Sequence, residues 1–511
     1  MKHGNKILSL AILAALSANT LPASAAAPDK VRVVVSFQPG KAAEIHKAAA
    51  AAHGAVVHEI FGMDAMALEV PTQALKGLQN NPNVLYVEED EKRYALALSK
   101  QGATGGQSVP YGISMVQADQ LSDASAGNRK VCIVDSGIDA NHEDLVGNRL
   151  TGEWDRGTGW WYTDENHHGS HVAGTIAAVN NALGVVGVNP NKNIQLHIVK
   201  VFGADGWAYS SSLTTAVNKC GAAGANVISM SLGGGRPMKT EEKAFSTLAA
   251  KNVLSIAAAG NDGTTAVSYP AGYASVVSVG ALDANKEWAS FSQYNSKVEL
   301  SAPGVSVLST VPMGTGAAPS LTVGNAAYTV SEMEGSPKAS ASAPLANFGL
   351  GDKVDGSVSG KICLIQRGTV DFATKVSNCQ ASGGKGAVVY NNVAGGFGGT
   401  LGTTVTAIPS VTASQADGQA MLGQLGQTAT VSVAPANYAS WDGTSMATPH
   451  VSAVAALVWS LHTNCTAAQL RVSLDNSAMD LGTAGRDAKF GFGLVQAKAA
   501  HDRINSMGCG K

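Results

Sequence analysis

A long apolar segment that begins beside a serine constrains this chain more than any other feature. Residues 451–459 are almost entirely Ala, Val, Leu and Trp, a composition typical of a buried helix, and Gly443-Thr444-Ser445 precedes them. A serine in that place lies near the unpaired N–H groups and the positive end of the helix dipole, which favour an oxyanion. The same pattern also fits an ordinary helix cap, so the serine alone decides nothing.

Two more polar residues stand at predicted element ends. The apolar run 131–134 predicts a strand that ends at Asp135. Open α/β sheets carry their sites at this carboxyl end of their strands. His168 begins a predicted helix. Taken singly, Asp135 also suits a turn, and His168 with His171 suits half of a metal site or a packed core histidine. Their joint occurrence, in the order Asp, His, Ser, favours nucleophilic catalysis.

These segments resemble the three signature blocks of the subtilisin-like serine proteases, the subtilases. The blocks read Asp-Ser-Gly-Ile-Asp at 135–139, His-Gly-Ser-His-Val-Ala-Gly-Thr at 168–175 and Gly-Thr-Ser-Met-Ala-Thr-Pro-His at 443–450. Further similarity covers 107–112, 231–234 and 258–261. The resemblance implies an α/β chain with a three-layer subtilisin-like fold and a mostly parallel central sheet. It assigns the catalytic domain to residues 97–312 and 438–511.

The resemblance also implies a role for each residue of the site. Ser445 is the expected nucleophile, His168 the base that takes and returns its proton, and Asp135 the carboxylate that orients the imidazole. The Ser445 N–H and the Asn261 side chain match the family's oxyanion hole, although Asn261 also suits a turn before Asp262. A binding protein without activity would be expected to lack one of these four residues, and all are present.

The N-terminal region predicts export. Lys2, His3 and Lys6 precede the apolar run 7–16, and Ala23-Ser24-Ala25 resembles a cleavage site, so residues 1–25 read as a signal peptide. The apolar run is shorter than the ~20 residues that span a bilayer, which disfavours a membrane anchor. We expect a secreted monomer with no membrane contact after signal removal. A net charge of −2, with 14% charged residues, gives no reason to expect nucleic-acid binding.

Residues 31–96 read as a separate, small α+β unit. Strands are predicted at 31–37, 67–70 and 84–87, and helices at 41–53 and 72–79. With its acidic ending at 87–90, the unit resembles the inhibitory propeptide of subtilases, and a permanent accessory domain is the alternative. The alignment of that ending places the processing site after Leu96. The chain's own propeptide is therefore an expected partner, beside protein and peptide substrates.

Residues 313–437 interrupt the subtilase pattern. Segments at 360–368, 372–375 and 381–391 resemble the protease-associated (PA) domain, which implies a β-rich inserted domain. Selection of substrates or partners is one interpretation of its role, and a passive lid or spacer is the other.

Six cysteines in an exported chain without a Cys-x-x-Cys pair indicate disulfides rather than a metal site. Cys363 and Cys379 share the insert, and Cys465 and Cys509 share the C-terminal part. Cys132 and Cys220 remain by elimination, with a buried free thiol at Cys132 as the alternative.

The resemblance also implies part of the substrate specificity. Gly206, Ser231, Leu232 and Gly233 are expected to flank an extended substrate as antiparallel strands, so main-chain recognition and broad specificity are favoured. Residues expected around the pocket for the residue before the scissile bond are Ala258, Gly260, Asp262 and Ser268. Ser268 is expected to shorten the pocket, and Asp262 to tolerate a basic side chain at its rim. A sequence-selective processing protease is the alternative, for which Asp262 and Asp205 are the acidic residues noted.

The same resemblance implies structural calcium. Its expected side-chain ligands are Gln107, Asp144 and Asn181, and its expected carbonyl ligands are those of Val179, Leu183 and Val185. All six donors are oxygens, as a hard cation requires. An ordinary Asn-rich loop is the alternative.

Overall fold

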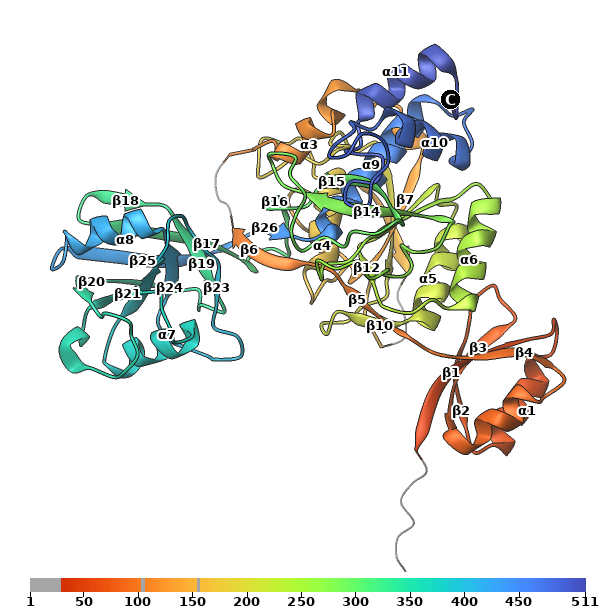
Figure 1. Ribbon diagram of the computed structural model, residues 1–511, viewed down its shortest axis with the longest axis horizontal. Helices are drawn as coiled ribbons and strands as arrows, with labels where there is room; N and C mark the ends of the chain where they lie inside the picture. The colour runs from red at the N-terminus through yellow and green to blue at the C-terminus, as the bar shows by residue number, and fades with distance from the viewer. Residues whose placement is uncertain (1–28, 103–105, 154–156) are drawn as a thin grey trace, which may run out of the picture.

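The computed structural model describes residues 29–102, 106–153 and 157–511. Three parts are distinct in Figure 1: a small N-terminal unit, a central helix-covered sheet, and an inserted sheet that projects from it. The expected signal peptide lies outside the described residues. Within them, no helix is both long and apolar enough to cross a membrane.

The central sheet has seven strands in the order β15-β14-β13-β11-β7-β9-β8, and every neighbouring pair is parallel. The strands are β7 (Lys130–Asp135), β8 (Arg149–Glu153), β9 (Gln195–Lys200), β11 (Val227–Met230), β13 (Leu254–Ala258), β14 (Val276–Leu282) and β15 (Val298–Pro303). Near-continuous apolar runs such as Val131–Val134 suit strands that are covered on both faces.

Helices cover both faces of this sheet. Val131 and Ile133 pack with α4 (His168–Ala177) and α9 (Thr444–Leu461), whereas Cys132 and Val134 pack with α5 (Ser210–Ala222) and α6 (Lys239–Ala250). This separation follows from the two-residue alternation of a strand. The expected three-layer α/β fold is confirmed. Further helices of the catalytic part are α3 (Tyr111–Met115), η2 (Ala118–Gln120), η3 (Ala126–Asn128), α10 (Ala467–Ser477) and α11 (Ala497–Met507).

The N-terminal unit is a four-stranded antiparallel sheet of order β2-β3-β1-β4 with helices packed on it. Its elements are β1 (Lys30–Phe37), α1 (Ala42–Ala51), β2 (Ala55–Glu59), β3 (Ala65–Pro71), η1 (Thr72–Ala74), α2 (Leu75–Gln79) and β4 (Val84–Glu89). Strand β2 was not predicted, because it has five residues and about half of them are polar. The predicted helix 72–79 is a 3-10 turn followed by a short helix.

The insert forms a nine-stranded sheet of order β18-β17-β25-β20-β21-β22-β24-β19-β23. Its elements are β17 (Gly316–Val323), β18 (Ala326–Tyr328), β19 (Val330–Glu334), β20 (Ser340–Asn347), η4 (Gly356–Val358), β21 (Ile362–Gln366), α7 (Phe372–Ala381), β22 (Gly386–Tyr390), β23 (Gly399–Thr400), β24 (Ser410–Ala413), α8 (Gln415–Leu422) and β25 (Thr428–Ala436). The expected β-rich insert is confirmed. It leaves the catalytic part after β16 (Val307–Thr310) and returns at β26 (Tyr438–Asp442), two antiparallel strands in which Thr310 faces Tyr438.

Three disulfide bonds join Cys132 to Cys220, Cys363 to Cys379 and Cys465 to Cys509. The first connects β7, the strand that ends at Asp135, to helix α5 across the sheet face. Cys132 is therefore bonded, and the alternative of a buried free thiol does not hold.

Candidate active site

The carboxylate of Asp135 and the imidazole of His168 form a buried pair. Asp135 is the last residue of β7 and His168 the first of α4. His168 Nδ1 lies 2.8 Å from Asp135 Oδ1 and 3.0 Å from Oδ2. The helix approaches the strand end so closely that a Cβ on Gly169 would stand 2.0 Å from the Gly137 carbonyl oxygen. Glycine at 169 therefore permits the pair to form.

Asp164 binds the residues that flank this pair, and it was not predicted from the sequence. Its carboxylate accepts hydrogen bonds from the Ser136 hydroxyl at 2.7 Å and from the Ser170 N–H and hydroxyl at 2.8 and 2.6 Å. Burial, with a smaller contribution from the nearby Asp135 charge, raises the pKa of Asp164 to about 6 despite these donors. The three residues fix the backbone next to Asp135 and at the start of α4.

Ser445 is the second residue of α9, where helical N–H groups are unpaired. Its Oγ donates to the Ser231 carbonyl oxygen at 2.8 Å. In the described part of the chain, His168 Nε2 has no hydrogen-bond partner, so the structure holds the serine turned away from the imidazole. Gly443, two residues before Ser445, has a φ of 149°, a conformation that favours glycine.

The carbonyl oxygen of Leu96 is held by two N–H donors. Asn261 Nδ2 donates to it at 2.8 Å and the Ser445 backbone N–H at 3.3 Å. Asn261 Oδ1 in turn accepts from the Thr444 N–H at 2.9 Å and hydroxyl at 2.8 Å, which fixes the amide plane. The chain's own Leu96–Ala97 peptide therefore lies beside Ser445, the expected nucleophile.

The residues before this peptide bind as an extended strand. β5 (Lys92–Ala95) lies between β10 (Trp207–Tyr209) and β12 (Leu232–Gly233), antiparallel to both. The Ala95 N–H donates to the Gly206 carbonyl at 3.0 Å and the Leu96 N–H to the Ser231 carbonyl at 3.3 Å. The segments expected to flank a substrate thus flank the chain's own junction.

The side chain of Leu96 lies beside Gly233 and Ser268. A Cβ on Gly233 would stand 3.2 Å from Leu96 Cδ1 and 2.3 Å from Ser268 Oγ, so this wall is closely packed. Gly260 donates its N–H to the Thr444 hydroxyl at 3.2 Å, and Ala258 is buried at the end of β13. Asp262 is exposed and accepts from Gln293 Nε2 at 3.1 Å. The effects expected of Asp262 and Ser268 on specificity stay predictions.

The second histidine of the His-x-x-His pair has a different environment. His171 Nε2 lies 3.0 Å from the Ala439 carbonyl oxygen, and its ring stacks on Trp441 at 4.7 Å. Burial lowers the pKa of His171 to about 3, so the ring is neutral. Its contacts are those of a packed core histidine.

Four of the six residues expected to bind calcium lie together around the Gln107 side chain. Gln107 Nε2 lies 3.0 Å from the Val179 carbonyl oxygen, 3.1 Å from that of Leu183 and 3.4 Å from Asn181 Oδ1. Asp144 Oδ2 accepts from the Val185 N–H, while its buried Oδ1 has no hydrogen-bond partner in the described structure. Burial raises the pKa of Asp144. Among the described residues, no three His, Cys, Asp or Glu side chains form a metal-binding group.

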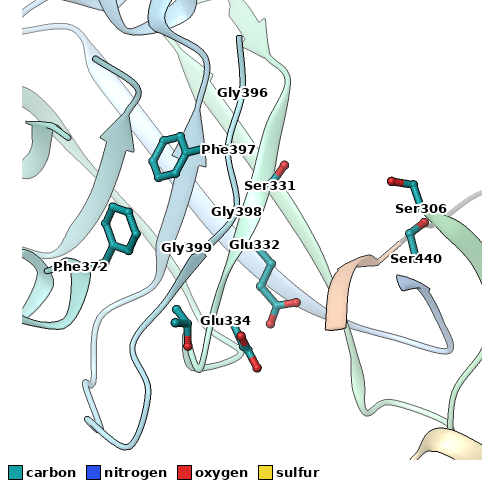
Figure 2. Close-up of a pocket in the computed structure, with 11 residues that line it drawn as sticks. Ser306, Ser331, Glu332, Glu334, Phe372, Gly396, Phe397, Gly398, Gly399 and Ser440 are labelled. Carbon is teal, nitrogen blue, oxygen red and sulfur yellow. The ribbon is translucent and has the colours of Figure 1, made fainter. Parts of the chain in front are cut away.

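The insert contributes residues to the cleft that holds the Leu96–Ala97 peptide. Glu334 of β19 lines one pocket with Ala97 and His168. A second pocket lies between the insert and the catalytic part, with Glu332, Glu334, Phe372 and Phe397 on one side and Ser306 and Ser440 on the other (Figure 2). Strand β6 (Leu98–Gly102), which follows the junction, pairs with β26 and lies against β17 and β19. The chain after Ala97 therefore leaves between the two domains.

An imidazole hydrogen-bonded to a carboxylate, a serine at a helix N-terminus and two N–H donors on one peptide carbonyl form an arrangement that suits a serine peptidase. A parallel sheet enclosed by helices carries that site here. The family model described as "Subtilase family" matches residues 127–347 and 396–493, and the "PA domain" model matches 322–421. The chain belongs to the subtilase family, carries an inserted PA domain and is a serine endopeptidase.

Similar proteins agree with this assignment. An alkaline protease of Alkalihalobacillus alcalophilus is 35% identical over 328 residues, which cover 61% of this chain and 82% of that protein. Subtilisin E of Bacillus subtilis (strain 168) is 37% identical over 272 residues, 51% of this chain and 67% of that protein. The crystal structure of the psychrophilic subtilisin-like protease Apa1 from Pseudoalteromonas sp. AS-11 has 43% identity and a TM-score of 0.62, covering 78% of this chain and 99% of that one.

Proposed function

We propose that this chain is the precursor of a secreted endopeptidase that cleaves proteins through Asp135, His168 and Ser445. The observation that carries the proposal is the Leu96 carbonyl oxygen, which the Asn261 amide and the Ser445 N–H both contact. These donors would stabilise the negative charge that forms on that oxygen when a nucleophile adds to the carbonyl carbon. Residues 1–25, which lie outside the described structure, would be the signal peptide.

The proposed reaction begins with a turn of the Ser445 side chain from the Ser231 carbonyl towards His168. Oγ then bonds to the substrate carbonyl carbon while its proton passes to His168 Nε2. Asp135 keeps the other proton on Nδ1 and stabilises the imidazolium. When the C–N bond breaks, His168 returns the proton to the leaving amine. Water, deprotonated by the same imidazole, releases the acyl group and restores Ser445.

We propose that residues 31–96 are the inhibitory propeptide, processed between Leu96 and Ala97. Support comes from two carboxylates that bind helix N-termini. Glu88 accepts from the Lys239 and Thr240 N–H groups of α6 at 2.8 and 2.9 Å, and Asp90 accepts from the Ser211 N–H of α5 at 3.0 Å. Such contacts favour a docked unit, while its last residues block the cleft. A permanent accessory domain would leave the junction intact.

Calcium is the proposed structural ion. The oxygens of Val179, Asn181 and Leu183 already surround the Gln107 amide, and Asp144 Oδ1 has no hydrogen-bond partner among the described residues, so the donor set fits a hard cation. Turning the Gln107 amide over would present its oxygen to the ion. The Val185 carbonyl is the remaining proposed ligand. The ion would stabilise this loop and take no part in the chemistry.

We propose that recognition rests chiefly on main-chain pairing with Gly206, Ser231, Leu232 and Gly233, which makes specificity broad at most substrate positions. The insert would add contacts on the leaving-group side, because β6 passes between β26 and the insert. A sequence-selective protease remains the second candidate, and one buried ion pair described below favours it.

The test is Ser445→Ala in the full chain. We expect the purified variant to keep its 96–97 bond intact by mass spectrometry and to leave casein uncleaved, because one nucleophile performs both reactions. Ser452→Ala, on the same helix and bonded to Ser229, is the matched control and should mature. Maturation of purified Ser445→Ala without another protease would overturn the proposal.

A further inference from the structure

Arg93 has an unusual place in the strand that fills the cleft. It stands four residues before the junction, counting Leu96 as the first, and its side chain is 0% exposed. Its neighbours Lys92 and Tyr94 on the same strand are exposed. The alternation of β5 thus sends one cationic side chain into the protein.

The partner of Arg93 is Glu241, in the first turn of α6. Arg93 Nε donates to Glu241 Oε1 at 3.1 Å and Nη2 to Oε2 at 2.8 Å, and both side chains are fully buried. Arg93 Nη2 also donates to the Arg236 carbonyl at 2.9 Å. This two-point geometry matches the planar guanidinium and cannot be reproduced by an ammonium group.

Glu241 belongs to the catalytic part and is held there independently of Arg93. The Ser210 hydroxyl donates to its Oε1 at 2.9 Å and the Tyr273 hydroxyl to its Oε2 at 2.6 Å. Burial alone would lower the pKa of Arg93, but the Glu241 carboxylate outweighs it and raises that pKa. Helix α6 and its neighbours therefore present a fixed acceptor that is satisfied best by a cation.

We propose that Glu241 is the base of a guanidinium-binding pocket that selects arginine at the fourth substrate residue before the scissile bond. The inference rests on the proposed function and deepens it. Because β5 has the register of a bound substrate, with its carbonyl in the oxyanion site, any extended substrate would place its corresponding side chain over Glu241. An apolar residue there would leave the Glu241 carboxylate with its two hydroxyl donors but without a counter-charge, and a glutamate would add repulsion.

The acidic residue that the sequence suggested for the recognition of a basic substrate side chain was Asp262. Asp262 is exposed at the rim and bound by Gln293, so it is less suited to select a charge than a fully buried carboxylate. The propeptide would then use the pocket as a substrate does, and its Arg93 would occupy the pocket until the propeptide leaves.

The test uses mature wild-type enzyme and fluorogenic peptides of sequence X-Tyr-Ala-Leu, in which X is Arg, Lys, Leu, Ala or Glu. We expect kcat/KM for Arg to exceed that for Ala or Leu by about tenfold or more, with Lys between them and Glu lowest. Glu241→Gln should reduce the Arg-to-Ala ratio to within about threefold. Glu242→Gln, exposed and adjacent on α6, is the matched control and should keep the ratio.

Equal kcat/KM for all five peptides in wild type would overturn the pocket while leaving the proposed peptidase intact. No cleavage of any peptide would instead defeat the proposed function. Because Glu241→Gln also weakens the precursor contact, a second variant, Arg93→Leu with Glu241→Leu, replaces the ion pair by apolar packing. Its mature form should prefer Leu over Arg, and a retained preference for Arg would contradict the assignment.

Discussion

The side-chain amide nitrogen of Asn261 lies 2.8 Å from the carbonyl oxygen of Leu96, a residue 165 positions earlier in the chain. The amide is fixed by two hydrogen bonds from Thr444, the residue next to Ser445. Asn261, the proposed oxyanion donor, is therefore linked through Thr444 to the start of the helix that carries Ser445, the proposed nucleophile.

Replacing Asn261 by alanine should lower kcat by roughly 10²–10³-fold, the magnitude known for such an amide in subtilisin itself. The loss should fall on kcat rather than KM, because the donor acts most strongly on the charged oxygen of the transition state. Steady-state kinetics on one peptide substrate measures both constants. A rise in KM with unchanged kcat would assign Asn261 to substrate binding instead.

Replacing Glu88 by glutamine should speed dissociation of the cleaved propeptide. Its carboxylate accepts from two N–H groups and the Thr240 hydroxyl at the start of α6, and the loss of its charge should weaken binding by about tenfold. The lag before full activity, followed after cleavage, reports this step. Glu89→Gln is the control, since Glu89 is exposed and 3.7 Å from Arg236. Equal lags in both variants and wild type would refute the docking role.

Chelation of calcium should lower the Tm of the mature enzyme and shorten its lifetime on heating, with initial activity retained. An ion that binds the folded state stabilises it in proportion to RT ln(1 + [L]/Kd). Asp144→Asn should reduce the calcium-dependent rise in Tm, measured by calorimetry, while Asp502→Asn in an exposed ion pair should keep it. Immediate loss of turnover that zinc but not calcium restores would point to a catalytic metal.

Acid should destabilise the precursor through two buried histidines. Burial lowers the pKa of His171 to about 3 and that of His450 to about 4, against about 6.5 in the unfolded chain. Between these values the unfolded state binds more protons, so stability is full above about pH 6.5 and falls as pH decreases towards 4 and 3. For His450 the loss is on the order of 3 kcal/mol.

Calorimetry of Ser445→Ala precursor from pH 7 to 4 measures this effect without self-digestion. Adding His450→Gln should make the fall in Tm shallower, because one titrating group is removed. Adding His46→Gln, at an exposed site, should leave the slope unchanged. Identical slopes in all three proteins would exclude His450 as a source of acid sensitivity.

The layered fold and the candidate catalytic residues were expected from a resemblance carried by three short sequence blocks, and such blocks can be recognised because their signals are local. Asp135, His168 and Ser445 each stand at an element end with a glycine one or two residues away, and the apolar runs around them have lengths typical of strand and helix. Strand β2 escaped because five half-polar residues carry little periodic signal.

Glu241 and Asp164 were not predicted from the sequence for a different reason. On the sequence, Glu241 is one of two adjacent glutamates in the polar first turn of a helix, the ordinary appearance of a solvated helix start. Its burial arises from Arg93, Ser210 and Tyr273, which come from three other segments. Asp164 is likewise buried by contacts with Ser136, 28 residues earlier, and with Ser170 at the start of the next helix. Contacts of that kind become visible when the chain is folded.

Thr310 and Tyr438 are paired in the antiparallel strands β16 and β26, and this pairing suggests how a domain could be inserted during evolution. The two ends of the PA domain meet as the ends of a hairpin loop would, so a gene that encoded a short turn there could receive a whole domain without a change of strand register. The entropic penalty of lengthening a connection grows slowly with its length. Sequence changes within the added domain can therefore accumulate without altering the pairing of β16 with β26, the strand that leads to the helix bearing Ser445.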